Sequence, residues 1–165
     1  MCLAGEKAET DVASDERAGG VRIIHAMARD VEEIASVLRD SFPGEASYYK
    51  IKSWYSEAKR IIRCDRGWIC LVAKKDREVV GVIAARCLKT EIPTVRIEWL
   101  AVRPNERGLG IGSRLIEELI GVVDAGFKEP VVRITLRARS DRHDFYRRIG
   151  FRCYGKGWMK MRFRH

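Results

Sequence analysis

The pattern of apolar and polar residues predicts an α/β protein that begins with one strand and two helices. The β-branched run Val21–Ala26 predicts the strand. Apolar residues then recur at helical spacing over 31–42, behind the capping-box pair Asp30 and Glu33. A second apolar face with the same period predicts a helix over Ser47–Ile62.

From residue 68 onward the period changes from helical to extended. Trp68–Ala73 and Val79–Leu88 are β-branched runs joined by a polar turn, so they predict a hairpin, and Thr94–Val102 predicts a further strand. The remaining segments predict a helix, a strand, a helix and a hairpin: Gly112–Asp124, Val131–Leu136, Asp141–Ile149 and Phe151–Phe163. This order, in which only the later part alternates β-α-β-α, predicts a mixed α/β sheet rather than a doubly wound one.

Length and composition place these elements in one domain. The chain has 165 residues, of which 46% are hydrophobic and 33% charged, as is usual for a globular domain. Residues 1–20 are small and polar and predict a disordered leader before a single domain over 21–165. Charges interrupt every apolar run, and the first residues do not resemble a signal peptide, so we expect a cytoplasmic protein without a membrane span.

Five cysteines give no sign of a metal site or a disulfide scaffold. They include no CxxC pair and no companion histidine cluster, so no metal is expected. Cys70 and Cys87 lie in apolar runs and are interpreted as core thiols, while a Cys64–Cys70 bridge has no positive support.

Positive charge is concentrated at the C-terminal end. Residues 131–165 hold eleven Lys and Arg but two acidic residues, so this segment alone carries the +9 net charge of the whole chain. In its last strand Met159, Met161 and Phe163 alternate with Lys160, Arg162 and Arg164, with one face inward and one outward. Such a basic region attracts anions, either a phosphorylated cofactor or nucleic acid.

A glycine loop between the strand ending at Val102 and the following helix carries the strongest chemical signal. Glycines there let backbone N–H groups approach an anion, and the helix N-terminus adds its positive dipole end. The loop lacks the Gly-Lys-Ser/Thr ending of a Walker A motif, because Ser113-Arg114 follows Gly112. Ser113 also replaces the third glycine of a Rossmann loop, which leaves that interpretation weak.

Two motifs resemble those of the GNAT N-acetyltransferase superfamily. Arg107-x-x-Gly110-x-Gly112 resembles the family's motif R/Q-x-x-G-x-G/A, and 143–151 resembles its x-x-F-Y-x-x-x-G-F segment. The element order also matches, so the resemblance covers roughly Val21–Arg164. It implies an acyl-CoA N-acyltransferase fold, with a mostly antiparallel sheet, splayed fourth and fifth strands and about four flanking helices.

The resemblance also implies acetyl-CoA as donor and assigns the residues that would hold it. The fourth strand would bind the pantetheine arm and polarise the acetyl carbonyl through its backbone, and the glycine loop with the Arg107 side chain would bind the pyrophosphate. These implied residues are Leu100, Ala101, Val102, Arg107, Gly108, Leu109, Gly110, Ile111, Gly112 and Ser113.

Tyr146 and Glu98 are the candidate catalytic residues. Tyr146 aligns with the family's frequent general acid, a phenol that protonates the departing thiolate; the alternative is a tyrosine that only packs its helix on the sheet. Alternation places Glu98 on the same face as Leu100 and Val102, where it could take the proton of the amine; alternatively it pairs with Arg96.

The other titratable and aromatic candidates have weaker assignments. His143 is expected near phosphate or solvent, and His25 is expected to be structural. Tyr48 and Tyr49 are candidate acceptor contacts, while Trp54 fits core packing.

The acceptor amine remains open: a protein N-terminus, a lysine, a polyamine, an aminoglycoside-like compound or a metabolite. Competing hypotheses are a nucleic-acid-binding protein that uses the basic segment, and a silent CoA-binding sensor. The family often dimerises, so a homodimer is a further expectation.

Overall fold

The computed structural model describes residues 20–45, 52–63, 67–128 and 131–164. Within these residues, four α-helices and seven strands follow the predicted order, with short 3₁₀ turns at Ala28–Asp30, Pro104–Glu106 and Ser140–Arg142. The elements are β1 (Arg22–His25), α1 (Val31–Ser41), α2 (Trp54–Ile62), β2 (Trp68–Lys75), β3 (Glu78–Leu88), β4 (Thr94–Val102), α3 (Ile111–Gly126), β5 (Val131–Arg137), α4 (His143–Ile149), β6 (Arg152–Gly155) and β7 (Trp158–Arg164).

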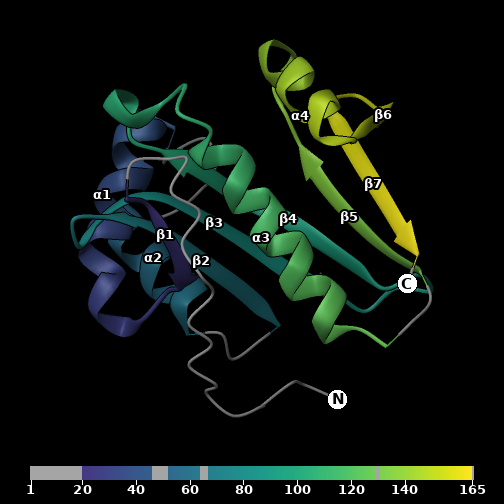
Figure 1. The fold of residues 1–165 in the computed structure, drawn as a ribbon, viewed down its shortest axis with the longest axis horizontal. Coiled ribbons are helices and arrows are strands. Elements are labelled where there is room, and N and C mark those ends of the chain that lie inside the picture. Colours follow the sequence, from purple (N-terminus) through teal and green to yellow (C-terminus); the bar gives the residue numbers. More distant parts are fainter. Residues whose placement is uncertain (1–19, 46–51, 64–66, 129–130, 165) are drawn as a thin grey trace.

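All strands form one sheet in the order β1-β2-β3-β4-β5-β7-β6 (Figure 1). Every neighbouring pair is antiparallel except β4 and β5, which are parallel because α3 connects them as a crossover. The predicted mixed sheet, mostly antiparallel and flanked by four helices, is confirmed.

Two apolar cores hold the helices on opposite faces of the sheet. Ile34, Leu38 and Ala58 of α1 and α2 pack on one face of β2–β4. Leu115 and Leu119 of α3 pack on the other face, together with the partly buried apolar residues of α4. Figure 1 shows α3 in front of the sheet and α1 and α2 behind it. No helix among the described residues is both long and apolar enough to cross a membrane.

The start of α1 differs from the predicted capping box. Asp30 occupies the N-cap position, but its side chain accepts from the backbone N–H of Met27 at 2.8 Å and pairs with Lys74. The Glu33 carboxylate accepts from the backbone N–H of Val79 at 2.6 Å instead of capping the helix. The two carboxylates therefore attach α1 to β2 and β3, a tertiary use that the local motif does not reveal.

The second helix begins later than predicted. Ser53 caps α2, and its hydroxyl accepts from the backbone N–H of Ser56 at 3.1 Å, so the helix starts at Trp54. Trp54 is buried as expected, whereas Tyr55 is 48% exposed, because only one side of the short helix faces the sheet. Residues 47–51, the start of the predicted helix, lie outside the described residues, as do residues 1–19 of the predicted leader over 1–20.

The most consequential feature of the sheet is a β-bulge in β4. Ala84 pairs with Trp99, but its neighbour Ala85 pairs with Ile97, which leaves Glu98 without a partner on β3. The parallel pairing of β4 with β5 ends at Ile97, so the rest of β4 has no strand beside it on that side. β5 then diverges from β4 and opens a V-shaped gap between them (Figure 1). The predicted splay is confirmed.

Candidate active site

The V between β4 and β5 exposes backbone groups of β4. The backbone N–H of Arg103 donates to the Val80 carbonyl at 2.9 Å. This bond shows which alternate residues of β4 direct their backbone groups toward β3. In an antiparallel pair the direction of these groups alternates, so the N–H and C=O of Leu100 and Val102 point into the V. Ala101 bonds toward β3, and its side chain is buried against α1 and α2.

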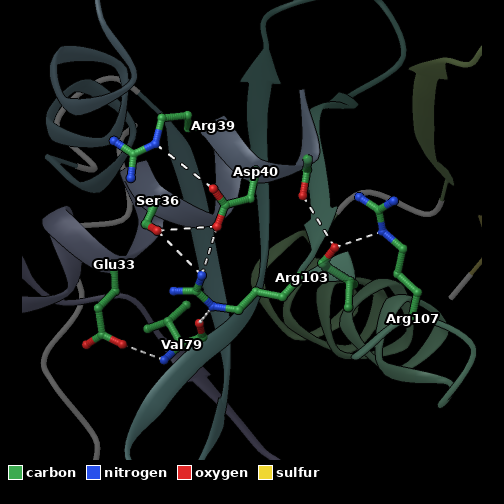
Figure 2. A network of polar contacts seen from close by, with 9 residues as sticks. Glu33, Ser36, Arg39, Asp40, Val79, Arg103 and Arg107 are labelled. Carbon is green, nitrogen blue, oxygen red and sulfur yellow. Dashed lines mark hydrogen bonds and ion pairs between the residues drawn. The ribbon is translucent and has the colours of Figure 1, made fainter. Parts of the chain in front are cut away.

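Two side chains contact this edge at Val102, the last residue of β4. The Val102 carbonyl accepts from Arg107 Nε at 3.0 Å and from Ser41 Oγ at 3.3 Å (Figure 2). The guanidinium of Arg107 is thereby held beside the V, while its terminal nitrogens make no hydrogen bond or ion pair with the other described residues. A cation fixed at one nitrogen and open at the other two is suited to bind an anion.

The glycine loop presents an unbroken set of free backbone donors. Among the described residues, the N–H groups of 108–113 donate to no backbone acceptor, and the helical bonds begin with Arg114 N–H to Gly110 O at 3.1 Å. Gly108 and Gly110 have φ of +79° and +78°, the left-handed conformation that favours glycine. A Cβ at either residue would meet nothing within 4 Å, so these two glycines border open space.

Gly112 differs from the other two glycines because it packs against protein. Its absent Cβ would lie 3.4 Å from the ring of Phe145, which joins the start of α3 to α4. Ile111 is buried in the core, whereas Leu109 is 57% exposed. Of the predicted loop, Gly108–Ser113 thus supplies donors on one side, and Ile111 and Gly112 anchor it on the other.

Tyr146 lies on α4 with its ring packed between aromatic neighbours. Its ring centroid lies 4.9 Å from that of Phe145 and 5.9 Å from that of Phe151. Burial raises the pKa of Tyr146 to about 12, and the charge of Arg142 offsets part of that rise. Its hydroxyl makes no hydrogen bond to a described residue, so within this part of the chain the phenol is a protonated donor that is open to a ligand.

The bulge places Glu98 on a different face from the one that alternation predicted. Leu100 and Val102 pack on the α3 side, but Glu98 lies on the α1–α2 side, where Arg96 Nε donates to its carboxylate at 2.7 Å. The pKa of Arg60 on α2 is raised mainly by its hydrogen bond to Glu57, and the charge of Glu98 makes a smaller contribution in the same direction. The expectation of a shared face was wrong, because the extra residue reverses the alternation.

His143 contacts residues that follow β5 and lie in β6. Its Nε2 is 3.3 Å from the Ala138 carbonyl and its Nδ1 is 3.7 Å from Cys153 Sγ. His25 is exposed at the end of β1 rather than structural. Tyr48 and Tyr49 lie outside the described residues, and Cys70 is buried as predicted.

Sequence reasoning missed the residues that hold the site together. Arg103 donates from Nε to the Val79 carbonyl at 3.0 Å and pairs with Asp40 at 3.0 Å, which fixes α1 beside the end of β4 (Figure 2). Arg139, which follows β5, lies 3.7 Å from Glu45, which follows α1. The sequence contains no local signal for these pairs, because their members are far apart in the chain.

Comparison with known families agrees with this geometry. The model of the acetyltransferase (GNAT) domain matches residues 66–153, which include β4, the glycine loop and Tyr146. The chain therefore belongs to the GNAT acetyltransferase family, whose acetyl donor is acetyl-CoA. A comparison with curated protein sequences found no match.

Solved structures share the fold over nearly their whole length. An aminoglycoside 6'-N-acetyltransferase complexed with coenzyme A is 17% identical, with a TM-score of 0.67 over 86% of this chain and 96% of that one. A GNAT acetyltransferase from Brucella melitensis in complex with acetyl-CoA is 24% identical (TM-score 0.63, 87% and 88% covered). A transcriptional regulator from Bacillus halodurans is 26% identical (TM-score 0.65, 83% and 96% covered).

Proposed function

We propose that this protein is an N-acetyltransferase that transfers the acetyl group of acetyl-CoA directly to a primary amine in a ternary complex. The observation that carries the proposal is the adjacency of two open sets of donors. The backbone edge of β4 at Leu100 and Val102, which has no strand beside it, leads to the free amides of Gly108–Ser113 at the start of α3.

These hydrogen-bonding groups fit the chemistry of acetyl-CoA. The loop amides, the dipole of α3 and the open nitrogens of Arg107 would bind the pyrophosphate. The edge of β4 would hydrogen-bond the amide groups of the pantetheine arm in the way that a neighbouring strand does. A backbone N–H near Leu100–Val102 would polarise the acetyl carbonyl.

Tyr146 and Glu98 would handle the protons of the reaction. The amine nitrogen attacks the thioester carbon, so a C–N bond forms and the C–S bond breaks. The Tyr146 hydroxyl would donate its proton to the sulfur, which leaves as a thiol, and it would regain a proton from solvent. Glu98, whose carboxylate lies 2.6 Å from the Arg96 guanidinium, would take the proton lost by the amine, directly or through water.

The decisive experiment measures donor binding and turnover separately. Calorimetry with CoA should give one binding site, and an amine panel should show thiol release that depends on both the amine and acetyl-CoA. CoA binding without turnover on any acceptor would instead support a silent CoA sensor. Absence of CoA binding to the folded protein would overturn the proposal.

A further inference from the structure

A second feature of the sheet lies on the face opposite α3. α1 and α2 pack on this face over β2, β3 and β4, and it continues onto β5, β7 and β6 (Figure 1). Ile134 and Leu136 of β5 belong to the core on the α3 side, so alternation directs Arg133, Thr135 and Arg137 to the opposite face. The face of β5 opposite α3 is therefore polar and basic.

The register of the strands aligns these side chains with other cations. Arg133 pairs with Arg162, and Thr135 pairs with Lys160, which in turn pairs with Arg152. On the other side of β5 the same row continues through Arg96 to Arg86. Together these residues form the basic face: Arg86, Arg96, Arg133, Arg137, Arg152, Lys160 and Arg162.

The basic face has little compensating negative charge. The sequences of β5, β6 and β7 contain no Asp or Glu, and Glu98 on β4 is already paired with Arg96. Like charges stand directly opposite each other at Arg86–Arg96 and Arg133–Arg162, an arrangement that destabilises a sheet. In addition, Arg133 Nε is buried and has no hydrogen-bond partner among the described residues. A buried donor of this kind indicates a missing acceptor.

The basic face borders the V on the side where an acceptor would enter. Arg96 and Thr135 occupy the next-to-last paired positions before β4 and β5 separate, and Arg137 lies just beyond. The glycine loop opens into α3, which covers the opposite face. If the donor approaches from the α3 side, as the proposed function requires, the amine must approach from the basic face.

We propose that the acceptor amine belongs to an acidic polypeptide segment, which binds in extended form across the basic face. The row from Arg86 to Arg152 crosses four interstrand steps, or about 19 Å, at about 4.8 Å a step. That length matches about six extended residues and exceeds a small metabolite. A polypeptide supplies the primary amine that the proposed reaction consumes, and the same charge repels polycationic acceptors such as polyamines and aminoglycosides.

The test uses three labelled peptides of equal length, each with one lysine, flanked by Glu, Ser or Arg. Binding is measured by fluorescence anisotropy in the presence of CoA, and acetylation is measured as kcat/KM for thiol release. We expect the Glu peptide to bind at least roughly tenfold more tightly than the Ser peptide, and the Arg peptide to bind least. The preference should shrink at high salt as the Debye length shortens.

Charge-reversal variants locate the effect. Arg162→Glu should weaken binding of the Glu peptide and raise its KM by roughly tenfold with little change in kcat. Arg22→Glu, which reverses an exposed cation on β1 at the far edge of the sheet, should leave binding and KM unchanged. A double variant, Lys160→Gln with Arg162→Gln, keeps the test valid if the single reversal fails to fold.

The outcomes separate this inference from the proposed function. Equal binding and equal kcat/KM for the three peptides would overturn the inference and leave acetyl transfer intact. Tight binding of a single-stranded oligonucleotide with no preference for the Glu peptide would also overturn it and identify a nucleic-acid surface. Absence of CoA binding would count against the proposed function. Peptide binding tests the inference separately, because it is measured without turnover.

Discussion

At the scale of single residues, the packing of Tyr146 sets up a clear test of its role. Its ring is held by Phe145 and Phe151, so removal of the hydroxyl alone in Tyr146→Phe should change packing and CoA affinity little. If the hydroxyl protonates the leaving thiolate, the chemical step should slow by roughly 10²–10⁴-fold. Single-turnover rates at saturating acetyl-CoA measure this step, and equal rates in the two proteins would remove Tyr146 from the mechanism.

Glu98 requires a test that distinguishes a base from a structural partner of Arg96. In Glu98→Gln a lost base should lower the single-turnover rate near neutral pH by roughly 10²-fold, because the amide cannot accept the proton. The rate should recover as pH rises, since more of the amine is then deprotonated by solvent. A merely structural role would lower thermal stability without this pH-dependent recovery, and that result would exclude Glu98 as the base.

At the scale of elements, the loop before α3 combines a special backbone with open space. Gly110→Val should abolish CoA binding, because a side chain would occupy the space next to the free amides. Valine is also strained at φ +78°, so the comparison needs a variant with the same backbone cost. Gly20→Val supplies it, because Gly20 has φ +71° and equally open surroundings near the start of β1.

Both variants should lose similar thermal stability, but only Gly110→Val should lose CoA affinity in calorimetry. A folded Gly110→Val protein that binds CoA normally would exclude this loop as the pyrophosphate-binding site.

At the scale of the whole molecule, the raised pKa of Tyr146 connects the site to alkaline stability. An unfolded tyrosine ionises near pH 10 and the folded one at about 12, so the folded state holds its proton longer. The resulting stabilisation is complete below pH 10 and disappears as pH rises through 12, a loss of about 2–3 kcal/mol.

Between pH 9 and pH 11.5 the free energy of unfolding, measured by denaturant titration, should therefore fall more in the wild type than in Tyr146→Phe. Parallel losses in the two proteins would show that the phenol is not buried in solution.

The charge of +9 also predicts the salt response of donor binding. Arg107→Ala should weaken CoA binding by roughly 1.5–3 kcal/mol, because a charge-assisted hydrogen bond to phosphate would be lost. The affinity of the wild type should fall between 50 mM and 500 mM salt, and that of the variant should fall less steeply. An affinity independent of salt in the wild type would contradict binding through phosphate.

The sequence by itself determined the elements and the local motif. Hydrophobic periodicity located every strand, because burial on a sheet requires alternation over a few neighbouring residues. The glycines at 108 and 110 are needed by local backbone conformation, so the donor loop was also predictable. The prediction failed locally at Asp30 and Glu33, whose side chains contact β2 and β3, and at Ser53, which caps α2 although the periodicity placed it inside a helix.

Only the tertiary structure decided the face of Glu98 and the existence of the basic face. The bulge in β4 depends on pairing with β3, and a single extra residue reverses the side on which everything after it points. The row from Arg86 to Arg152 joins residues from five strands, whose alignment depends on register and strand order. Those relations are set by packing across the sheet, and no pattern along the chain encodes them on its own.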